Sequence, residues 1–384
     1  MRFEFSTATQ ILFGHATLQQ VPDRAASMGR KVFLLTGRQR ERASGLLAAL
    51  LGRGLEVLTF AVLGEPRIDL IDEAVARTRE EGCDLVIGLG GGSVIDAAKA
   101  VAALHSNPGE IMAYLEVIGR GQPLSRPGLP CIAIPTTAGT GAEVTRNSVL
   151  TSAEHRVKVS LRSPWMLPRL AVVDPELTLS LPPDITAATG LDALTQLIEA
   201  YVTPAANPLT DGLCREGIRR VSRSLFRAWE QPDDRDARED MALASLFGGL
   251  ALANAKLGAV HGFAAPLGGL FDMPHGLVCA RLLPLVMDAN VQALRTRAPE
   301  SLALARYAEV ARLLSNQPQA SADDGAAWVR ALCAAFKVPG LAAAGLTAGA
   351  IPLVTAKAGK ASSMKGNPIP LTERELTGIL EKAL

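Results

Sequence analysis

The chain has 384 residues, enough for two domains at the usual size of roughly 150 residues each. Apolar residues make up 48% and charged residues 20%, so the chain can bury a large core and is not disordered. Lys and Arg total 39 against 38 acidic residues, a formal net charge of +1. This balance lacks the basic surplus that binds nucleic acids or anionic membranes, so we expect neither as a partner.

The cysteines and the N-terminus indicate the cellular compartment of the protein. Five cysteines, at positions 83, 131, 214, 279 and 333, are widely spaced and include no C-x-x-C pair. This usage is typical of a reduced cytoplasmic protein and argues against a disulfide framework and a zinc site made of cysteines. The N-terminus has no apolar run of a signal peptide, and the apolar stretch 241–271 is interrupted too early to span a membrane. We therefore expect a cytoplasmic protein.

The first 175 residues alternate strand-like and helix-like segments. Strands are predicted at 31–36, 56–60, 84–89, 131–134 and 170–173, with helical patterns between them such as 68–81 and 93–104. Three of the strands are continuous apolar runs, as expected where helices cover both faces of a parallel sheet. The alternation predicts an open α/β sheet.

The character of the sequence changes after Asp174. The segment from Leu181 to Asp184 (LPPD) is a break followed by a helix start, and the rest of the chain is rich in long Ala/Leu helical patterns with almost no β-branched runs. We predict two domains, an α/β domain over residues 1–180 and an all-helical domain over residues 181–384.

A glycine-rich turn follows the predicted strand 84–89. Gly90, Gly91 and Gly92 are consecutive, and Ser93 is placed to cap the following helix. Glycines let a backbone approach a ligand closely, and a helix N-terminus favours a phosphate. The spacing is not the strict G-x-G-x-x-G, and no acidic residue follows about 20 positions later in the usual place of that motif. The turn indicates pyrophosphate binding, with a ligand-free strand–helix turn as the alternative.

A second loop, PTTAGTGAEVT, follows the strand at 131–134. It supplies the hydroxyls of Thr136, Thr137 and Thr140 between glycines. The carboxyl ends of strands are where α/β sheets bind ligands, so we expect both loops to line one edge of the sheet.

A third group of residues lies in the predicted helical domain. Asp192 and Gln196 are four residues apart on a helical pattern and project from one face. His261 and His275 flank a turn that contains GGLFDMP. Two imidazoles and a carboxylate could hold a divalent metal such as iron or zinc. From spacing alone, histidines satisfied within a core are the favoured interpretation, and a metal site is the alternative.

Six motifs in chain order resemble those of the iron-containing (group III) alcohol dehydrogenases, whose relatives include lactaldehyde reductase and propanediol dehydrogenase. The motifs are GGGSVIDAAKA, PTTAGTGAEVT, GLDALTQLIEAYVT, LGAVHGFAAPLGG, MPHG and KGNPIPLT. The resemblance implies a Rossmann-like dinucleotide-binding domain and an all-α metal-binding domain, as in the dehydroquinate synthase-like architecture, usually in a homodimer.

The resemblance also assigns residues to roles. It places metal ligands at Asp192, Gln196, His261 and His275, and it places Asn147 toward the substrate. It implies cofactor contacts in and after both loops, at Gly92, Ser93, Asp96, Thr136, Thr137, Thr145 and Lys158.

The chain departs from the family pattern at three places. Gln196 stands where the family usually has a histidine ligand, and an amide oxygen is a weaker ligand for iron or zinc. Ala265 replaces a histidine that is thought to assist proton transfer. After the strand at 31–36, Gly37 replaces the aspartate that binds the ribose 2′-OH of NAD, and Arg38 and Arg40 follow. Losing a carboxylate and gaining guanidinium groups favours the 2′-phosphate of NADP(H), unless these arginines are merely solvated.

These observations predict an NAD(P)-dependent, metal-assisted alcohol dehydrogenase or aldehyde reductase. Asp192, His261 and His275 would act through Fe²⁺ or Zn²⁺, and hydride would pass between nicotinamide C4 and a small to medium alcohol or aldehyde. The alternatives are a metal-independent reductase resembling maleylacetate reductases and a non-catalytic nucleotide-binding relative.

Overall fold

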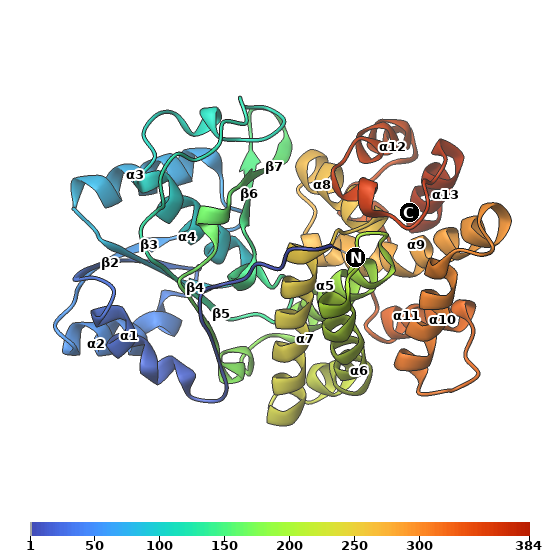
Figure 1. Cartoon of the computed structure of the whole chain (residues 1–384), viewed down its shortest axis with the longest axis horizontal. Helices are drawn as coiled ribbons and strands as arrows, with labels where there is room; N and C mark the ends of the chain where they lie inside the picture. The colour runs from blue at the N-terminus through green and yellow to red at the C-terminus, as the bar shows by residue number, and fades with distance from the viewer. Residues whose placement is uncertain (1) are drawn as a thin grey trace. The chain divides into compact units, whose positions relative to one another are not determined.

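The computed structural model describes residues 2–384, which form two compact units (Figure 1). The α/β unit contains residues 6–137 and 141–179. The helical unit contains residues 138–140 and 180–384, together with the described residues before position 6. The predicted α/β sheet and helical region are both present.

Six parallel strands form the sheet of the α/β unit, in the order β1-β8-β5-β4-β2-β3. They are β1 (Ile11–Phe13), β2 (Lys31–Thr36), β3 (Glu56–Ala61), β4 (Leu85–Gly90), β5 (Cys131–Pro135) and β8 (Leu170–Val173). The five predicted strands are confirmed within one residue at each end. The sequence did not reveal β1, because three residues are too few for a periodic pattern.

Helices cover both faces of this sheet. One face packs against α1 (Val21–Ala26) and α2 (Ser44–Gly52), and the other against α3 (Ile68–Glu80) and α4 (Gly92–His105) (Figure 1). Along β2, Val32 and Leu34 belong to the first core and Phe33 and Leu35 to the second. Because both faces are buried, the strand is apolar at consecutive positions, as the sequence indicated.

A separate antiparallel hairpin, β6 (Asn147–Ser152) and β7 (Val157–Arg162), belongs to the same unit. Its first strand packs against α4. The sequence did not reveal it, because two of its alternating buried positions are serines, Ser148 and Ser152, which break the apolar alternation.

The regular elements of residues 180–384, all of which are described, are helical. The α-helices are α5 (Pro183–Val202), α6 (Pro208–Glu230), α7 (Arg235–Asn254), α8 (Ala259–Phe271), α9 (His275–Arg297), α10 (Leu302–Ser315), α11 (Ala322–Ala335), α12 (Ile351–Gly359) and α13 (Glu373–Ala383). One large apolar core joins them.

Helix α9 is long and apolar enough by composition to cross a membrane, and so is the pair α7 and α8 if it is counted as one bent segment. However, 67% of the apolar window of α9 is buried inside the protein. The helix packs against α5, α8, α11 and α13, and residues such as Leu282 and Leu283 are fully enclosed. We interpret α9 as the central core helix of the helical unit.

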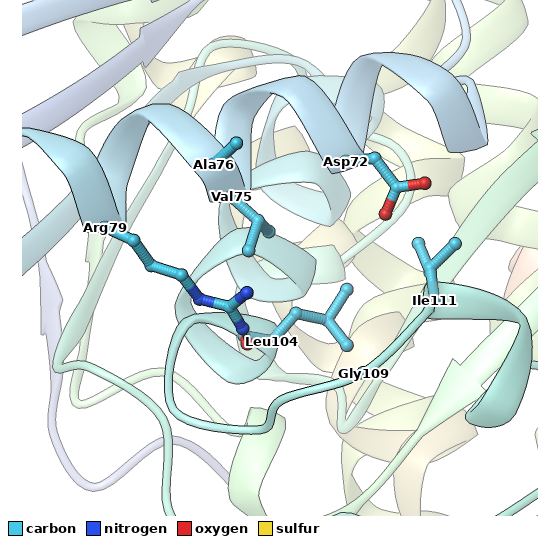
Figure 2. A pocket seen from close by; sticks show the side chains of 7 residues that line it. All are labelled: Asp72, Val75, Ala76, Arg79, Leu104, Gly109 and Ile111. Carbon is cyan, nitrogen blue, oxygen red and sulfur yellow. Dashed lines mark hydrogen bonds between the residues drawn. The ribbon is translucent and has the colours of Figure 1, made fainter.

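A small cavity of about 70 Å³ lies between α3 and the segment after α4 (Figure 2). Arg79 donates from Nε to the His105 carbonyl at 3.0 Å and from Nη2 to the Asn107 carbonyl at 3.1 Å. These carbonyls belong to the C-terminal end of α4 and the residues just after it, which lack helical partners. Arg79 therefore caps α4, and a space of this size holds water rather than a substrate.

Candidate active site

The helical unit gathers Asp192, His261 and His275 at one point. Oδ1 of Asp192 lies 3.4 Å from Nε2 of His261 and 3.5 Å from Nε2 of His275. Tetrahedral donors bound to a metal at ~2.1 Å are ~3.4 Å apart. The side chains of Asp192 and His261 are 3% and 8% exposed, whereas His275 is 35% exposed and keeps one side of the cluster open. The spacing fits a shared divalent metal.

Local sequence features bring these three side chains together. Asp192 lies on the buried face of α5, and His261 lies in the first turn of α8. Pro274 precedes His275, the first residue of α9. A Cβ atom on Gly276 would lie 2.7 Å from the carbonyl oxygen of Ala188 on α5. Only glycine at this position lets the start of α9 approach α5 this closely.

Glu199, also on α5, fixes the orientation of His261. Its Oε2 is 2.6 Å from Nδ1 of His261, and its Oε1 accepts a hydrogen bond from the Val260 amide at 2.8 Å. Because a carboxylate accepts and does not donate, Nδ1 of His261 carries the proton and Nε2 faces Asp192. This carboxylate–histidine pairing is the arrangement that orients histidine ligands of metals.

The electrostatics of the cluster favour a cation. Burial alone would lower the pKa of His261, but the negative charges of Glu199 and Asp192 and the hydrogen bond to Glu199 raise it to about 10. Burial alone would raise the pKa of Asp192, yet His275 and His261 hold it well below its usual range. Two buried carboxylates therefore bind positive charge strongly, and a divalent metal satisfies the same demand.

Two oxygen atoms here are buried without a hydrogen-bond partner among the described residues. They are Oδ1 of Asp192, which belongs to the cluster, and Oε1 of Gln196, one helical turn further along α5. Such atoms are rare in folded proteins and often mark the place of a ligand or ion. Cys279 lies on the other side, with Sγ 3.6 Å from Nε2 of His275. Donor atoms of Asp192, His261, His275 and Cys279 all lie within 4.8 Å of one another.

The motif KGNPIPLT near the C-terminus supports the start of α8. Oδ1 of Asn367 accepts a hydrogen bond from the Ala259 amide at 3.1 Å, and Nδ2 donates to Oδ1 of Asn290 at 2.6 Å. Asn367 and Glu199 thus cap the first two amides of the helix that carries His261. The role of this motif is structural and concerns the placement of one metal-ligand candidate.

Several of the cofactor candidates lie in the α/β unit at the carboxyl ends of three neighbouring strands. A cavity of about 290 Å³ is lined there by residues that follow β2, β4 and β5, including Gly37, Arg38, Gly91, Thr136 and Thr137. Strand order reverses between β2 and β4. Open α/β sheets bind ligands at this switch point, so the two predicted loops and the segment after β2 form one candidate dinucleotide site.

The glycine turn has a packing role as well. A Cβ atom on Gly90 would lie 2.5 Å from Val94 Cγ2, and one on Gly88 would lie 2.7 Å from the Ala98 Cβ. These two glycines allow α4 to pack closely on β4. The prediction that Ser93 caps the helix is wrong, because α4 begins at Gly92 with Gly91 as its N-cap and Ser93 lies within the first turn. The first amides of α4, at Gly92 and Ser93, remain a suitable phosphate site.

A buried lysine accounts for several of the other candidate residues. Nζ of Lys99, fully buried in α4, lies 2.9 Å from Oδ1 of Asp96 and donates to Oγ1 of Thr145 at 2.9 Å and to the carbonyl of Asn147. Asp96 also accepts from the Val149 amide at 2.9 Å. In the structure these residues tie α4 to the start of β6.

The remaining two cofactor candidates lie away from this cavity's lining. Nζ of Lys158 on β7 forms an ion pair with Glu65 at 2.9 Å. Thr140 belongs to the short segment 138–140 of the helical unit, where Gly139 packs closely against Thr189 of α5.

Sequence reasoning missed four residues around these sites. Glu199 lies seven positions after Asp192, and Cys279 four positions after His275, so helical spacing places each on its partner's face. Gln39 and Arg42, which line the cavity, lie one and four positions after Arg38 and could have been read as part of the same segment.

Comparison with known proteins agrees with this geometry. Residues 8–175 match the family model of the iron-containing alcohol dehydrogenases, and residues 186–384 match the C-terminal model of Fe-containing alcohol dehydrogenases. The chain belongs to the iron-containing alcohol dehydrogenase family. The match confirms the predicted oxidoreductase acting on CH–OH groups, with a nicotinamide cofactor and a divalent metal, and lends no weight to the metal-independent alternative.

Individual relatives point the same way. The chain is 37% identical to 1,3-propanediol dehydrogenase of Klebsiella pneumoniae over 81% of its own length and 79% of the relative's. It is 47% identical to long-chain-alcohol dehydrogenase 1 of Geobacillus thermodenitrificans (strain NG80-2), over 59% of this chain and only 56% of that protein. A crystal structure of a 1,3-propanediol oxidoreductase superposes with a TM-score of 0.90 at 33% identity and covers all of both chains. The predicted fold class is thereby confirmed.

Proposed function

We propose that this protein is a metal-assisted alcohol dehydrogenase or aldehyde reductase that accepts NADP(H). The observation that carries the proposal is the group of donors from Asp192, His261 and His275, whose separations of 3.4 and 3.5 Å match the edges of a metal coordination polyhedron. These three side chains would hold Fe²⁺ or Zn²⁺, with Gln196 beside them.

Each residue of the cluster has a distinct task. Asp192 supplies the negative charge, His261 is held by Glu199 with Nε2 toward the site, and the partly exposed His275 borders the open side. When bound, the metal supplies a Lewis acid for the substrate oxygen and the nicotinamide supplies or accepts hydride. With Ala265 in place of a histidine, the proton has to travel by water, a ribose hydroxyl or another group.

The segment after β2 supports the preference for NADP(H). Arg38 and Arg42 line the cavity and offer guanidinium groups to a 2′-phosphate, whereas Arg40, the second arginine expected from the sequence, is not among the lining residues. A Cβ atom on Gly37 would meet only Val94 Cγ2, at 3.9 Å, so packing does not demand glycine there. The absence of an acidic residue at position 37 therefore bears on the cofactor rather than on the fold.

The remaining features complete the proposal. A small to medium alcohol or aldehyde is the proposed substrate, with Asn147 contributing to its pocket. We further propose that the protein is a cytoplasmic homodimer without nucleic-acid or membrane partners. The five buried cysteines support the cytoplasmic location, and the near-neutral charge supports the absence of such partners. The homodimer follows from the family resemblance.

The test is metal-dependent turnover with both nicotinamides. Protein purified without chelator is stripped, reloaded with Fe²⁺ or Zn²⁺, and assayed for reduction of an aldehyde series with NADPH and NADH. We expect activity to disappear with the metal, return on reloading and be higher with NADPH. Full activity of the stripped protein would overturn the metal assignment, and a clear NADH preference would overturn the cofactor assignment.

A further inference from the structure

Cys279 lies where a metal ligand would lie. It is one helical turn after His275 on α9, is fully buried, and its Sγ is 3.6 Å from Nε2 of His275. Its Sγ and the donors of Asp192, His261 and His275 all lie within 4.8 Å of one another. Oδ1 of Asp192 is buried in the same cluster without a hydrogen-bond partner among the described residues.

The distances match those of a tetrahedral site that includes sulfur. With Zn–S of ~2.3 Å and Zn–N of ~2.05 Å, sulfur and nitrogen donors at the tetrahedral angle are ~3.6 Å apart. The separation between Cys279 and His275 has this value, and the separations of 3.4 and 3.5 Å from Asp192 to the imidazoles fit oxygen–nitrogen edges. The other separations among the four donors are at most 4.8 Å, so all four lie close enough to converge on one ion.

Gln196 is the competing fourth ligand. Its Oε1 lies against Gly248 of α7, where an added Cβ atom would be only 3.0 Å away. An amide oxygen is neutral and binds iron or zinc less strongly than a thiolate binds zinc. The chain thus has a weak oxygen donor at position 196 and a sulfur donor at position 279.

We propose that Cys279 supplies the fourth ligand to the metal, as a thiolate, in place of the side chain at position 196. The inference rests on the proposed function, because it assumes that Asp192, His261 and His275 hold a metal. The resulting set of one carboxylate, two imidazoles and one thiolate keeps four protein ligands and favours zinc over iron, and the substrate oxygen would enter as a fifth ligand. It differs from the ligand set that the resemblance implied, in which Gln196 is the fourth ligand.

Cobalt(II) substitution tests the proposal without relying on activity. Metal-free full-length protein is titrated with Co²⁺, and the near-ultraviolet absorption is recorded for the thiolate-to-cobalt charge-transfer band. We expect the band in the wild type and in Gln196→Ala, and its loss in Cys279→Ser. Cys214→Ser is the matched control, since Cys214 is another fully buried cysteine of the helical unit that lies outside the cluster.

Zinc affinity from competition with a chelating dye gives a second measurement. Loss of a direct ligand should lower the affinity by more than tenfold, as even loss of a group that only orients a ligand costs ~10–100-fold. We expect this loss in Cys279→Ser and less than about a threefold change in Gln196→Ala. Circular dichroism of each variant shows whether it has folded.

The outcomes separate this inference from the proposed function. Stoichiometric Co²⁺ binding without the band, or with affinity that depends on Gln196 alone, would overturn the role of Cys279 and leave the metal centre in place. Failure of the wild type to bind Co²⁺, Zn²⁺ or Fe²⁺ would overturn both.

Discussion

The cofactor edge of the α/β unit and the metal cluster of the helical unit are built from different parts of the chain. At the cofactor edge, the residues that line the cavity lie in short consecutive segments after β2, β4 and β5. In the metal cluster, the candidate ligands at positions 192, 261 and 275 come from three different helices. A site of the first kind can be recognised from consecutive residues, whereas a site of the second kind forms only when the helices pack.

The two units also bury carboxyl groups in opposite ways. Asp192 lies between two imidazoles, which hold its pKa low, whereas burial raises the pKa of Glu143, in the loop after β5, to about 7. A buried carboxyl stays charged where nearby cations outweigh the effect of burial, and it protonates where burial outweighs them, as at Glu143 despite the charge of Lys99. The contrast identifies the helical cluster as the place that is prepared for a cation.

The largest expected effect concerns the metal ligands. Replacement of His261 or His275 by Ala should remove the metal and lower kcat/KM by about 10³-fold or more, since a Lewis-acid contribution of several kcal/mol is lost. Metal content and steady-state kinetics measure this. His155→Ala, an exposed histidine between β6 and β7, is the control and should behave as the wild type. Wild-type rates in both ligand variants would contradict the assignment.

The next largest effect is expected on the free energy of unfolding when Glu143 is replaced. Its folded pKa of about 7 exceeds the ordinary 4.5, so its stabilising contribution is complete below pH 4.5 and is lost as the pH rises through 7. Glu143→Gln should therefore match the wild type near pH 4.5 and be more stable by on the order of 3 kcal/mol at pH 8. Denaturant unfolding at the two pH values checks this. Equal stability of both proteins at pH 8 would show that Glu143 is stabilised as a carboxylate.

Replacement of Glu199 tests how far metal binding depends on the orientation of His261. Glu199→Gln keeps the shape but weakens the hold on Nδ1 of His261, so metal affinity should fall by about 10–100-fold. Excess metal should then restore most of the activity, which distinguishes a positioning residue from a ligand. An unchanged affinity in a metal titration would mean that packing alone orients His261.

The smallest expected effect lies at the cofactor edge. Gly37→Asp places a carboxylate where a 2′-phosphate is expected, and the space around position 37 admits the side chain. The ratio of kcat/KM for NADPH to that for NADH should fall by about tenfold or more, a difference of about 1.4 kcal/mol. Arg24→Ala, on α1 outside the cavity lining, serves as the surface control. No change in the ratio would indicate that the 2′ position lies elsewhere.

Much of the fold could be predicted from the sequence, because a sheet covered on both faces leaves continuous apolar strands such as β2 and β4. The hairpin of β6 and β7 could not be predicted, since the serines at the buried positions 148 and 152 break the alternation of apolar and polar residues. The metal-ligand candidates were assigned through resemblance, because spacing alone cannot show that His275 lies beside Asp192. The contributions of Gly276 and Glu199 depend on how α5, α8 and α9 pack, which no local pattern records.

The central claim is that Asp192, His261 and His275 hold one divalent metal. Elemental analysis of protein purified without chelator, and without an affinity tag that binds metal, tests it most directly. The account predicts about one iron or zinc per chain, and loss of that metal in Asp192→Asn. A metal-free protein that cannot be reconstituted with iron or zinc would contradict it.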